Sequence, residues 1–147
     1  MKFYDCFDIL LDDRITLKIL EKNEGSGDIL PYYFYAIHEN QSGCFAGRIS
    51  IRIGDNCHSY YNGHIGYEIE PDKRGSGYAA RASRLVLPVA KFHGMERIYI
   101  TCGINNVASR KTIEKLGAAF VENAKIPEDC FFFRDGIEEY CIYKLEL

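Results

Sequence analysis

The chain has 147 residues, of which 47% are hydrophobic and 27% are charged, and its formal net charge is −3. These values are typical of one soluble globular domain with a hydrophobic core. The slight acidic excess gives no driving force for binding to nucleic acid or to an anionic membrane, so we expect neither partner.

The first residues and the cysteines favour a cytoplasmic location. Asp5, Asp8, Asp12 and Asp13 interrupt any apolar stretch that could act as a signal peptide, and no apolar run is long enough to span a bilayer. The six cysteines are widely spaced and form no C-x-x-C pair, so we expect reduced thiols rather than disulfides.

A zinc site is the alternative use of cysteine in an intracellular chain. Cys57 and His58 are adjacent, and His64 follows closely. This spacing fits no common zinc template, so we expect no metal.

Alternating apolar residues predict strands in the first half of the chain. Ile15, Leu17 and Ile19 lie on one face of such a segment, and Pro31 precedes an aromatic-rich one. The turn at Gly43 predicts a hairpin between two neighbouring segments. The strands expected in this half are residues 14–20, 31–39, 44–53 and 64–70, with loops over 21–30 and 54–63.

Two helices are expected in the second half. Residues 77–93 have the apolar spacing of a helix, and Pro88 inside them removes a backbone hydrogen bond and predicts a kink. The second helix, residues 107–116, can be capped by Asn105 or Asn106. The remaining expected elements are strands over 97–102, 118–123 and 138–147 and an irregular loop over 124–137.

The predicted order is therefore β-β-β-β-α-β-α-β-β, with no repeat, linker or low-complexity segment. Such an order is typical of a single α+β domain over residues 1–147. We expect one mixed, largely antiparallel central sheet of about seven strands, flanked by helices.

The stretch RGSGYAA, residues 74–80, is the most informative motif. It matches the dinucleotide-binding spacing G-x-G-x-x-A, but residues 71–74 separate it from the preceding strand, which should run directly into the first glycine. From Arg74 the same residues give R-x-x-G-x-A at the start of a helix, where backbone N–H groups can bind an anion. Arg74 can add a charge-assisted contact. The alternative is a plain strand-to-helix turn.

A larger stretch, residues 64–120, resembles the GNAT superfamily of acetyl-coenzyme A-dependent N-acetyltransferases. R-x-x-G-x-A is similar to its pyrophosphate loop, and N-x-x-S-x-x-x-x-E-K-x-G, from Asn106 to Gly117, is similar to its second cofactor-facing helix. This version resembles the acetyltransferases that act on ribosomal-protein N-termini. The resemblance implies the acyl-CoA N-acyltransferase fold and acetyl-CoA as donor. The cofactor-binding residues that it implies are Ile69, Arg74, Gly75, Ser76, Gly77, Tyr78, Ala79, Ala80, Asn106 and Ser109.

The resemblance also implies direct transfer of acetyl to an amine in a ternary complex. An alkyl ammonium must lose a proton before it can attack, so a general base is needed. Glu68 is the first choice, His64 the second and Glu70 the third. The alternative for Glu68 is a solvated carboxylate or a partner of Arg48 or Arg52.

Two further roles follow from the resemblance. The strand 64–70 should splay from the strand 97–102, with the N–H of Ile69 as a candidate oxyanion donor. Many members have a tyrosine acid where this chain has Ile113. Ser109 is then the candidate for assisting departure of the thiolate, although an early-helix hydroxyl can equally bond to backbone.

The acceptor side departs from the superfamily, whose members usually have two helices between the first two strands. Here only residues 21–30 fill that gap, so the site must be open or be closed by 54–63, 124–137 or a second subunit, which leaves a homodimer open. The expected acceptor is a small-molecule or peptide amine. The acceptor-pocket or interface candidates are His58, Tyr60, Tyr61 and residues 131–133, although a core position under the sheet is also compatible with the three phenylalanines.

Two non-enzymatic functions remain as alternatives. One is an acyl-CoA-binding or sensing domain that kept the turn and lost the acid at Ile113. The other is a structural partner that dimerises through its phenylalanine cluster. Fold alone does not separate these from an enzyme.

Overall fold

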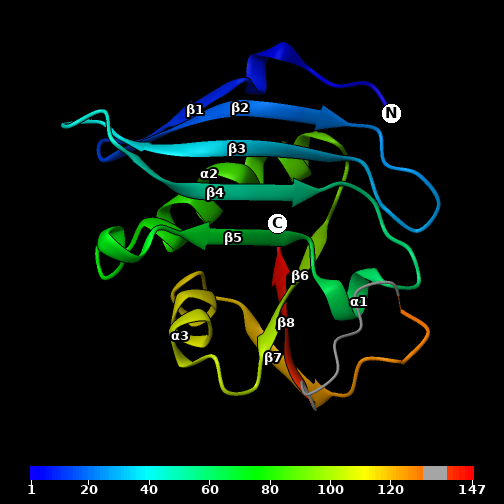
Figure 1. The fold of residues 1–147 in the computed structure, drawn as a ribbon. Coiled ribbons are helices and arrows are strands. Elements are labelled where there is room, and N and C mark those ends of the chain that lie inside the picture. The colour runs from blue at the N-terminus through cyan, green and yellow to red at the C-terminus, as the bar shows by residue number, and fades with distance from the viewer. Residues whose placement is uncertain (131–138) are drawn as a thin grey trace.

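The computed structural model describes residues 1–130 and 139–147, and these confirm the α+β class (Figure 1). The strands within them form two antiparallel sheets. The five-stranded sheet has the order β1 (Ile9–Leu11), β2 (Ile15–Asn23), β3 (Tyr32–Glu39), β4 (Phe45–Arg52) and β5 (Ile65–Ile69). The three-stranded sheet has the order β6 (Arg97–Gly103), β8 (Tyr140–Glu146) and β7 (Ala119–Ala124).

Helices cover and connect these sheets. Helix α2 (Tyr78–Phe92) lies behind the five-stranded sheet, and α3 (Val107–Lys115) lies beside the smaller sheet (Figure 1). The shorter elements are α1 (Ser59–Asn62) and two 3-10 turns, Asp5–Phe7 and Pro71–Lys73. None of the helices in the described residues has the length and apolar character that a membrane crossing needs.

The core lies between α2 and the five-stranded sheet. The alternation predicted for β2 puts Ile15 and Leu17 on the inner face, where both are fully buried. Val86 and Val89 of α2 are fully buried against that face, in the same apolar cluster. Removal of this apolar surface from water is the main force that holds the helix on the sheet.

The structure adds detail that the sequence pattern missed. A single sheet of about seven strands was expected, but the described strands form one sheet of five and one of three. The additional strand is β1, which pairs with β2 at the edge of the larger sheet. Strand β2 continues to Asn23, which pairs with Tyr32, so the connection to β3 is shorter than expected. Helix α2 continues through Pro88, where the carbonyl that loses its partner belongs to the exposed residue Arg84 and can be hydrated.

Among the described residues, the two sheets are joined by hydrogen bonds between His64 and Tyr99 and then diverge. The backbone N–H of His64 donates to Tyr99 O at 2.7 Å, immediately before β5 begins. Beyond it, β5 pairs only with β4 and β6 only with β8 among the described strands. This confirms the expected splay of the two strands, and it opens the space in which the candidate site lies.

Candidate active site

A cavity of about 450 Å³ lies between β5, the β5–α2 connection and α3. Nine of the residues implied by the sequence line it: Glu68, Ile69, Arg74, Gly75, Gly77, Tyr78, Ala79, Asn106 and Ser109. Ser76 and Ala80 line a neighbouring cavity of about 630 Å³, which shares Gly77 with the first. The two segments of the sequence that carry the motifs therefore face one another across one site.

The glycine turn leaves the N-terminus of α2 open to this site. Gly75 and Gly77 have φ of 87° and 76°, the left-handed conformation that favours glycine. A Cβ atom at either position would meet nothing within 4 Å, so the space in front of the turn is empty of protein. No side chain in the described part of the chain caps the helix at Gly77. The first N–H groups of α2 are thus available to an anion.

Side chains around the turn hold it in place. Arg74 Nε donates to Ile69 O at 3.0 Å. Lys73 Nζ lies 2.8 Å from Glu39 Oε1, and the Tyr78 hydroxyl donates to Glu39 Oε2 at 2.6 Å. These contacts lower the pKa of the Glu39 carboxyl to about 2. The Tyr78 side chain is buried and bonded to Glu39, so it stabilises the turn and does not face an anion. The groups that can face an anion belong to the residues next to it.

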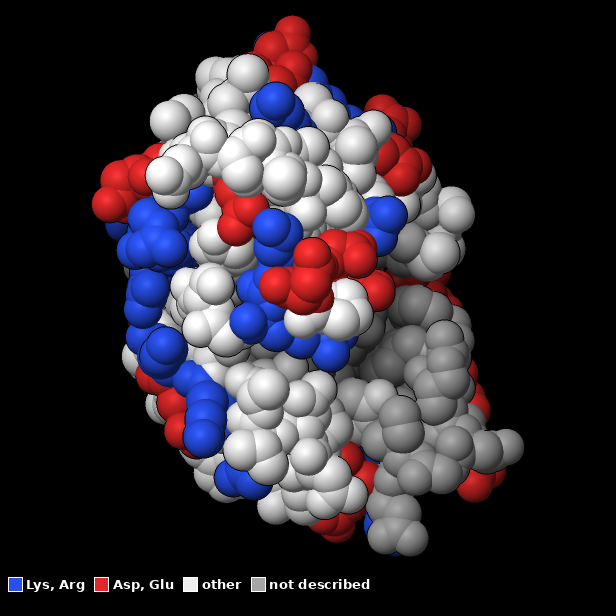
Figure 2. Space-filling view, turned by 60° about the vertical axis from the view of Figure 1, so that its left-hand side comes forward, with Lys and Arg blue, Asp and Glu red and all other residues white. Residues whose placement is uncertain are grey.

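Basic side chains surround the turn although the chain as a whole is acidic. Lys73, Arg74 and Lys115 line the first cavity, and Arg81 and Arg84 line the neighbouring one. Figure 2 views the molecule from the end that carries the β5–α2 connection and shows Lys and Arg side chains along it, with Asp and Glu among them. Lys73 is paired with Glu39 and Arg81 with Asp12 and Asp13. The charges without a carboxylate partner among the described residues are those of Arg74, Arg84 and Lys115, and they favour an anionic ligand.

Asn106 begins α3 in the way the motif predicts. Its side-chain oxygen accepts a hydrogen bond from the Ser109 N–H at 3.1 Å, so Asn106 is the N-cap and also lines the cavity. Ser109 and Thr112, one helical turn apart, face the cavity from the same side of α3. Ile113 is 1% exposed and belongs to the core, so the position where relatives have tyrosine does not face the site here.

Tyr67 is a cavity residue that the sequence analysis missed. Its hydroxyl is buried and has no hydrogen-bond partner among the described residues. Burial raises the pKa of Tyr67, and the nearby hydroxyls of Ser109 and Thr112 lower it by less, although neither reaches normal hydrogen-bond geometry. Alternation along HIGYEIE groups Tyr67 with Ile65 and Ile69, which is the pattern of a core aromatic. Only the splay of the sheets shows that its hydroxyl reaches the cavity.

Glu68 is exposed on β5 and lines the cavity. In the β4–β5 ladder it lies opposite Arg48, one of the two arginines considered as its partner. The structure shows no ion pair between these two residues, which leaves the Glu68 carboxylate facing the site.

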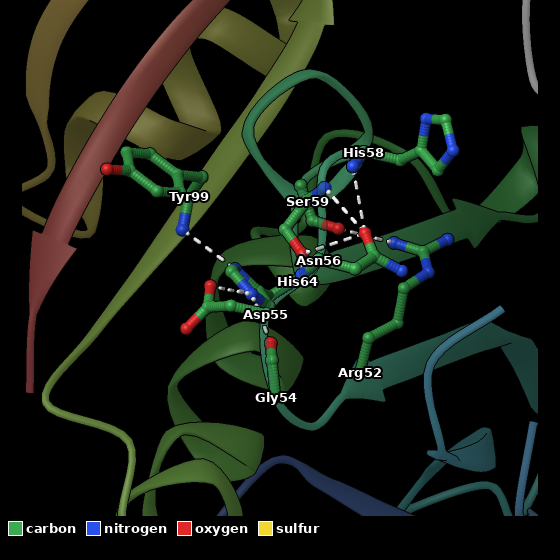
Figure 3. Close-up of polar contacts among 9 residues, drawn as sticks. Arg52, Gly54, Asp55, Asn56, His58, Ser59, His64 and Tyr99 are labelled. Atoms are coloured by element: carbon green, nitrogen blue, oxygen red, sulfur yellow. Dashed lines mark hydrogen bonds and ion pairs between the residues drawn. The ribbon is translucent and has the colours of Figure 1, made fainter. Parts of the chain in front are cut away.

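His64 lies elsewhere, which corrects its expected role as a base. It is fully buried, and both ring nitrogens are engaged (Figure 3). Nδ1 accepts from the Tyr99 N–H at 2.9 Å, so Nε2 carries the proton and lies 2.9 Å from Gly54 O and 3.2 Å from Asp55 Oδ1. Burial lowers the pKa of His64, which keeps it neutral. Its role is to join the two sheets.

The acceptor-side candidates are only partly brought together. His58 lines a separate cavity of about 290 Å³, at the end of the five-stranded sheet where β4 and α1 meet. Tyr60 donates its hydroxyl to Glu122 of β7, and the backbone oxygen of Tyr61 accepts from Thr101. Both tyrosines thus connect α1 to the smaller sheet. The three phenylalanines, residues 131–133, lie outside the described residues.

Two diverging sheets around an open helix N-terminus form a site for an anionic group such as a pyrophosphate. A model of the acetyltransferase (GNAT) domain matches residues 7–119, and the chain belongs to this family. No curated protein sequence gives a significant match.

Solved structures share the fold. A candidate ribosomal-protein-serine acetyltransferase from Vibrio cholerae has a TM-score of 0.68 at 14% identity, over 95% of this chain and 97% of that one. An acetyltransferase from Salmonella typhimurium that modifies the N-terminal serine of the 50S subunit protein L7/L12 has a TM-score of 0.61 at 18% identity, over 79% and 64%. The microcin C7 self-immunity acetyltransferase MccE, in complex with acetyl-CoA and AMP, has a TM-score of 0.62 at 21% identity, over 79% and 61%.

Proposed function

We propose that this chain transfers acetyl from acetyl-CoA to the amine of a peptide or a small molecule by direct attack in a ternary complex. The observation that carries the proposal is the open glycine turn at the N-terminus of α2, which shares one cavity with Glu68 and with the start of α3. The empty space in front of Gly75 and Gly77 fits a pyrophosphate, because phosphate oxygens must come close to the backbone.

Each cofactor-facing group has a defined task in this proposal. The N–H groups that follow Gly77, with Arg74 beside them, bind the pyrophosphate. Asn106 and Ser109 bind the pantetheine arm from α3, and the Ile69 N–H stabilises the oxyanion. Bound acetyl-CoA supplies an activated thioester. Glu68 takes the proton that the acceptor ammonium must lose before its nitrogen can attack.

Tyr67 is proposed to take the place of the tyrosine that this chain lacks at Ile113. Its buried hydroxyl lies beside Ser109, where the leaving sulfur develops negative charge. Because burial raises its pKa, Tyr67 stays protonated at neutral pH and can donate. The Ser109 hydroxyl then acts together with Tyr67 to assist departure of the thiolate.

Tyr67→Phe should lower kcat by about tenfold and leave acetyl-CoA affinity unchanged, because a lost donor to the leaving group acts only in the transition state. The melting temperature should stay the same or rise, since the substitution removes an unpartnered buried hydroxyl. Steady-state kinetics measure kcat, and calorimetry measures the acetyl-CoA affinity and the melting temperature. Tyr4→Phe, which lies against Phe92 at the C-terminal end of α2, is the control. An unchanged kcat in Tyr67→Phe would remove this residue from the mechanism.

A peptide α-amine is the acceptor class that a structural relative supports. The Salmonella relative acts on a protein N-terminal serine, which favours a peptide α-amine. A homodimer that closes the site stays a proposal, and the exposed Phe120 and Val121 on the edge strand β7 support it. The cytoplasm is the proposed location, in agreement with six free cysteines.

A panel of amines tests the function. Peptides that begin with Ser or Ala, polyamines and amino acids are incubated with acetyl-CoA, and thiol release is followed together with the mass of the product. We expect turnover with one class. Acetyl-CoA binding without turnover on any amine would instead support the non-catalytic acyl-CoA-binding domain.

A further inference from the structure

Three connections far apart in the sequence meet beside α1, away from the acetyl-CoA cavity. They are the β2–β3 connection with Asp28, the segment before α1 with Cys57 and His58, and the segment after β7 with Cys130. None of these four residues lines the cavity that holds Glu68. They include the residue types that ligate zinc in proteins.

Asn56 organises this meeting point. Its side-chain oxygen accepts hydrogen bonds from the N–H groups of His58 and Ser59, at 2.9 and 3.1 Å (Figure 3). Its side-chain nitrogen donates to the backbone oxygen of Asp28 at 2.8 Å. Asn56 therefore fixes the backbone that carries His58 and joins it to the backbone that carries Asp28.

Three side chains converge at ligand distances. One ligand atom each from Asp28, Cys57 and His58 lie within 4.8 Å of one another. His58 Nε2 and Asp28 Oδ2 are 3.3 Å apart. Two such ligands of a tetrahedral zinc, each about 2.1 Å from the metal, stand roughly 3.4 Å apart. The observed separation of these two atoms matches that geometry.

The other nitrogen of His58 has a partner as well. Nδ1 lies 3.1 Å from Cys130 Sγ, and both side chains are nearly buried. An Nδ1–H that donates to the sulfur directs Nε2 toward Asp28 and Cys57. A metal-bound histidine commonly donates its other N–H in this way, which fixes the tautomer.

We propose that Asp28, Cys57 and His58 bind one divalent cation of borderline softness, with Zn²⁺ the best match to an O, S and N ligand set. A water molecule would complete a tetrahedral set, and Cys130 positions His58. His64, the third member of the zinc set weighed from the sequence, takes no part because it lies outside this cluster, next to Tyr99 and Gly54. The cation would hold the β2–β3 connection against α1, where the two acceptor-side helices of the superfamily are replaced by a short loop.

Cobalt titration of the full, reduced, metal-free chain tests the site. We expect one equivalent of Co²⁺ to give visible bands of a tetrahedral centre with a thiolate charge-transfer band, and Zn²⁺ to displace it. Cys57→Ser should remove the charge-transfer band, and Asp28→Asn should weaken Zn²⁺ binding at least tenfold. Zn²⁺ should raise the melting temperature of the wild type but not of Cys57→Ser.

Cys44→Ser is the matched control, because Cys44 is also an exposed free cysteine but lies on the β3–β4 turn. It should bind Co²⁺ like the wild type. The absence of saturable binding, or the same spectrum in Cys57→Ser, would overturn the site and leave His58 as an ion-pair partner of Asp28. Acetyl-CoA affinity should be unchanged in Cys57→Ser, so this test is independent of the acetyltransferase proposal.

Discussion

Gly77→Glu is expected to weaken acetyl-CoA binding by at least about a hundredfold, because each lost hydrogen bond to a charged group is worth roughly 1.5–3 kcal/mol and the new carboxylate repels the pyrophosphate. The left-handed φ of 76° at Gly77 also disfavours any L-residue, which shifts the turn away from the cavity. The space in front of the turn, now empty of protein, would hold the new side chain. Calorimetric titration with acetyl-CoA and with desulfo-CoA measures the loss.

Gly94→Glu is the matched control for backbone strain and for added charge. Gly94 ends the same helix, has φ of 88°, and a Cβ there would also meet nothing within 4 Å. It lies at the C-terminal end of α2, where no N–H groups are free to bind an anion. Equal losses in the two variants would show general destabilisation instead of a phosphate site. Unchanged acetyl-CoA affinity in Gly77→Glu would show that RGSGYAA begins the helix without binding the pyrophosphate.

Local motifs made the cofactor side of the site predictable. The R-x-x-G-x-A turn and the cap at Asn106 both depend on residues within one or two helical turns, so their spacing carries the information. Their meeting across one cavity was implied by the resemblance to the superfamily, because period-two patterning locates strands but does not give their order in a sheet.

Long-range contacts were not predictable in the same way. Nothing local shows that His64 uses both nitrogens, because its partners Gly54 and Tyr99 lie on separate segments. The hydroxyl of Tyr67 reaches the cavity only because the two sheets diverge. The convergence of Asp28 with Cys57 depends on a β2–β3 connection whose length the alternation pattern overestimated. Such contacts come from tertiary packing, which sequence spacing does not encode.

Glu68→Gln is expected to lower kcat by about 10²–10⁴, the usual contribution of a general base, and to leave acetyl-CoA affinity unchanged. The substitution keeps the size of the side chain and removes its ability to accept a proton. Because Glu68 is exposed and forms no ion pair with any described residue, its replacement should not change the melting temperature. Single-turnover acetylation of the best amine in the panel measures the chemical step directly.

The pH profile and a second carboxylate separate a base from a general charge effect. Glu96→Gln removes one exposed carboxylate outside both cavities and should behave as the wild type. If Glu68 is the base, the loss in Glu68→Gln should shrink as the pH approaches the pKa of the free amine, because more of the acceptor is then already deprotonated; that pKa is about 8 for a peptide α-amine and about 10.4 for an alkyl amine. A loss that is constant with pH would instead mean that Glu68 attracts or orients a cationic acceptor, in which case the proton leaves by way of water.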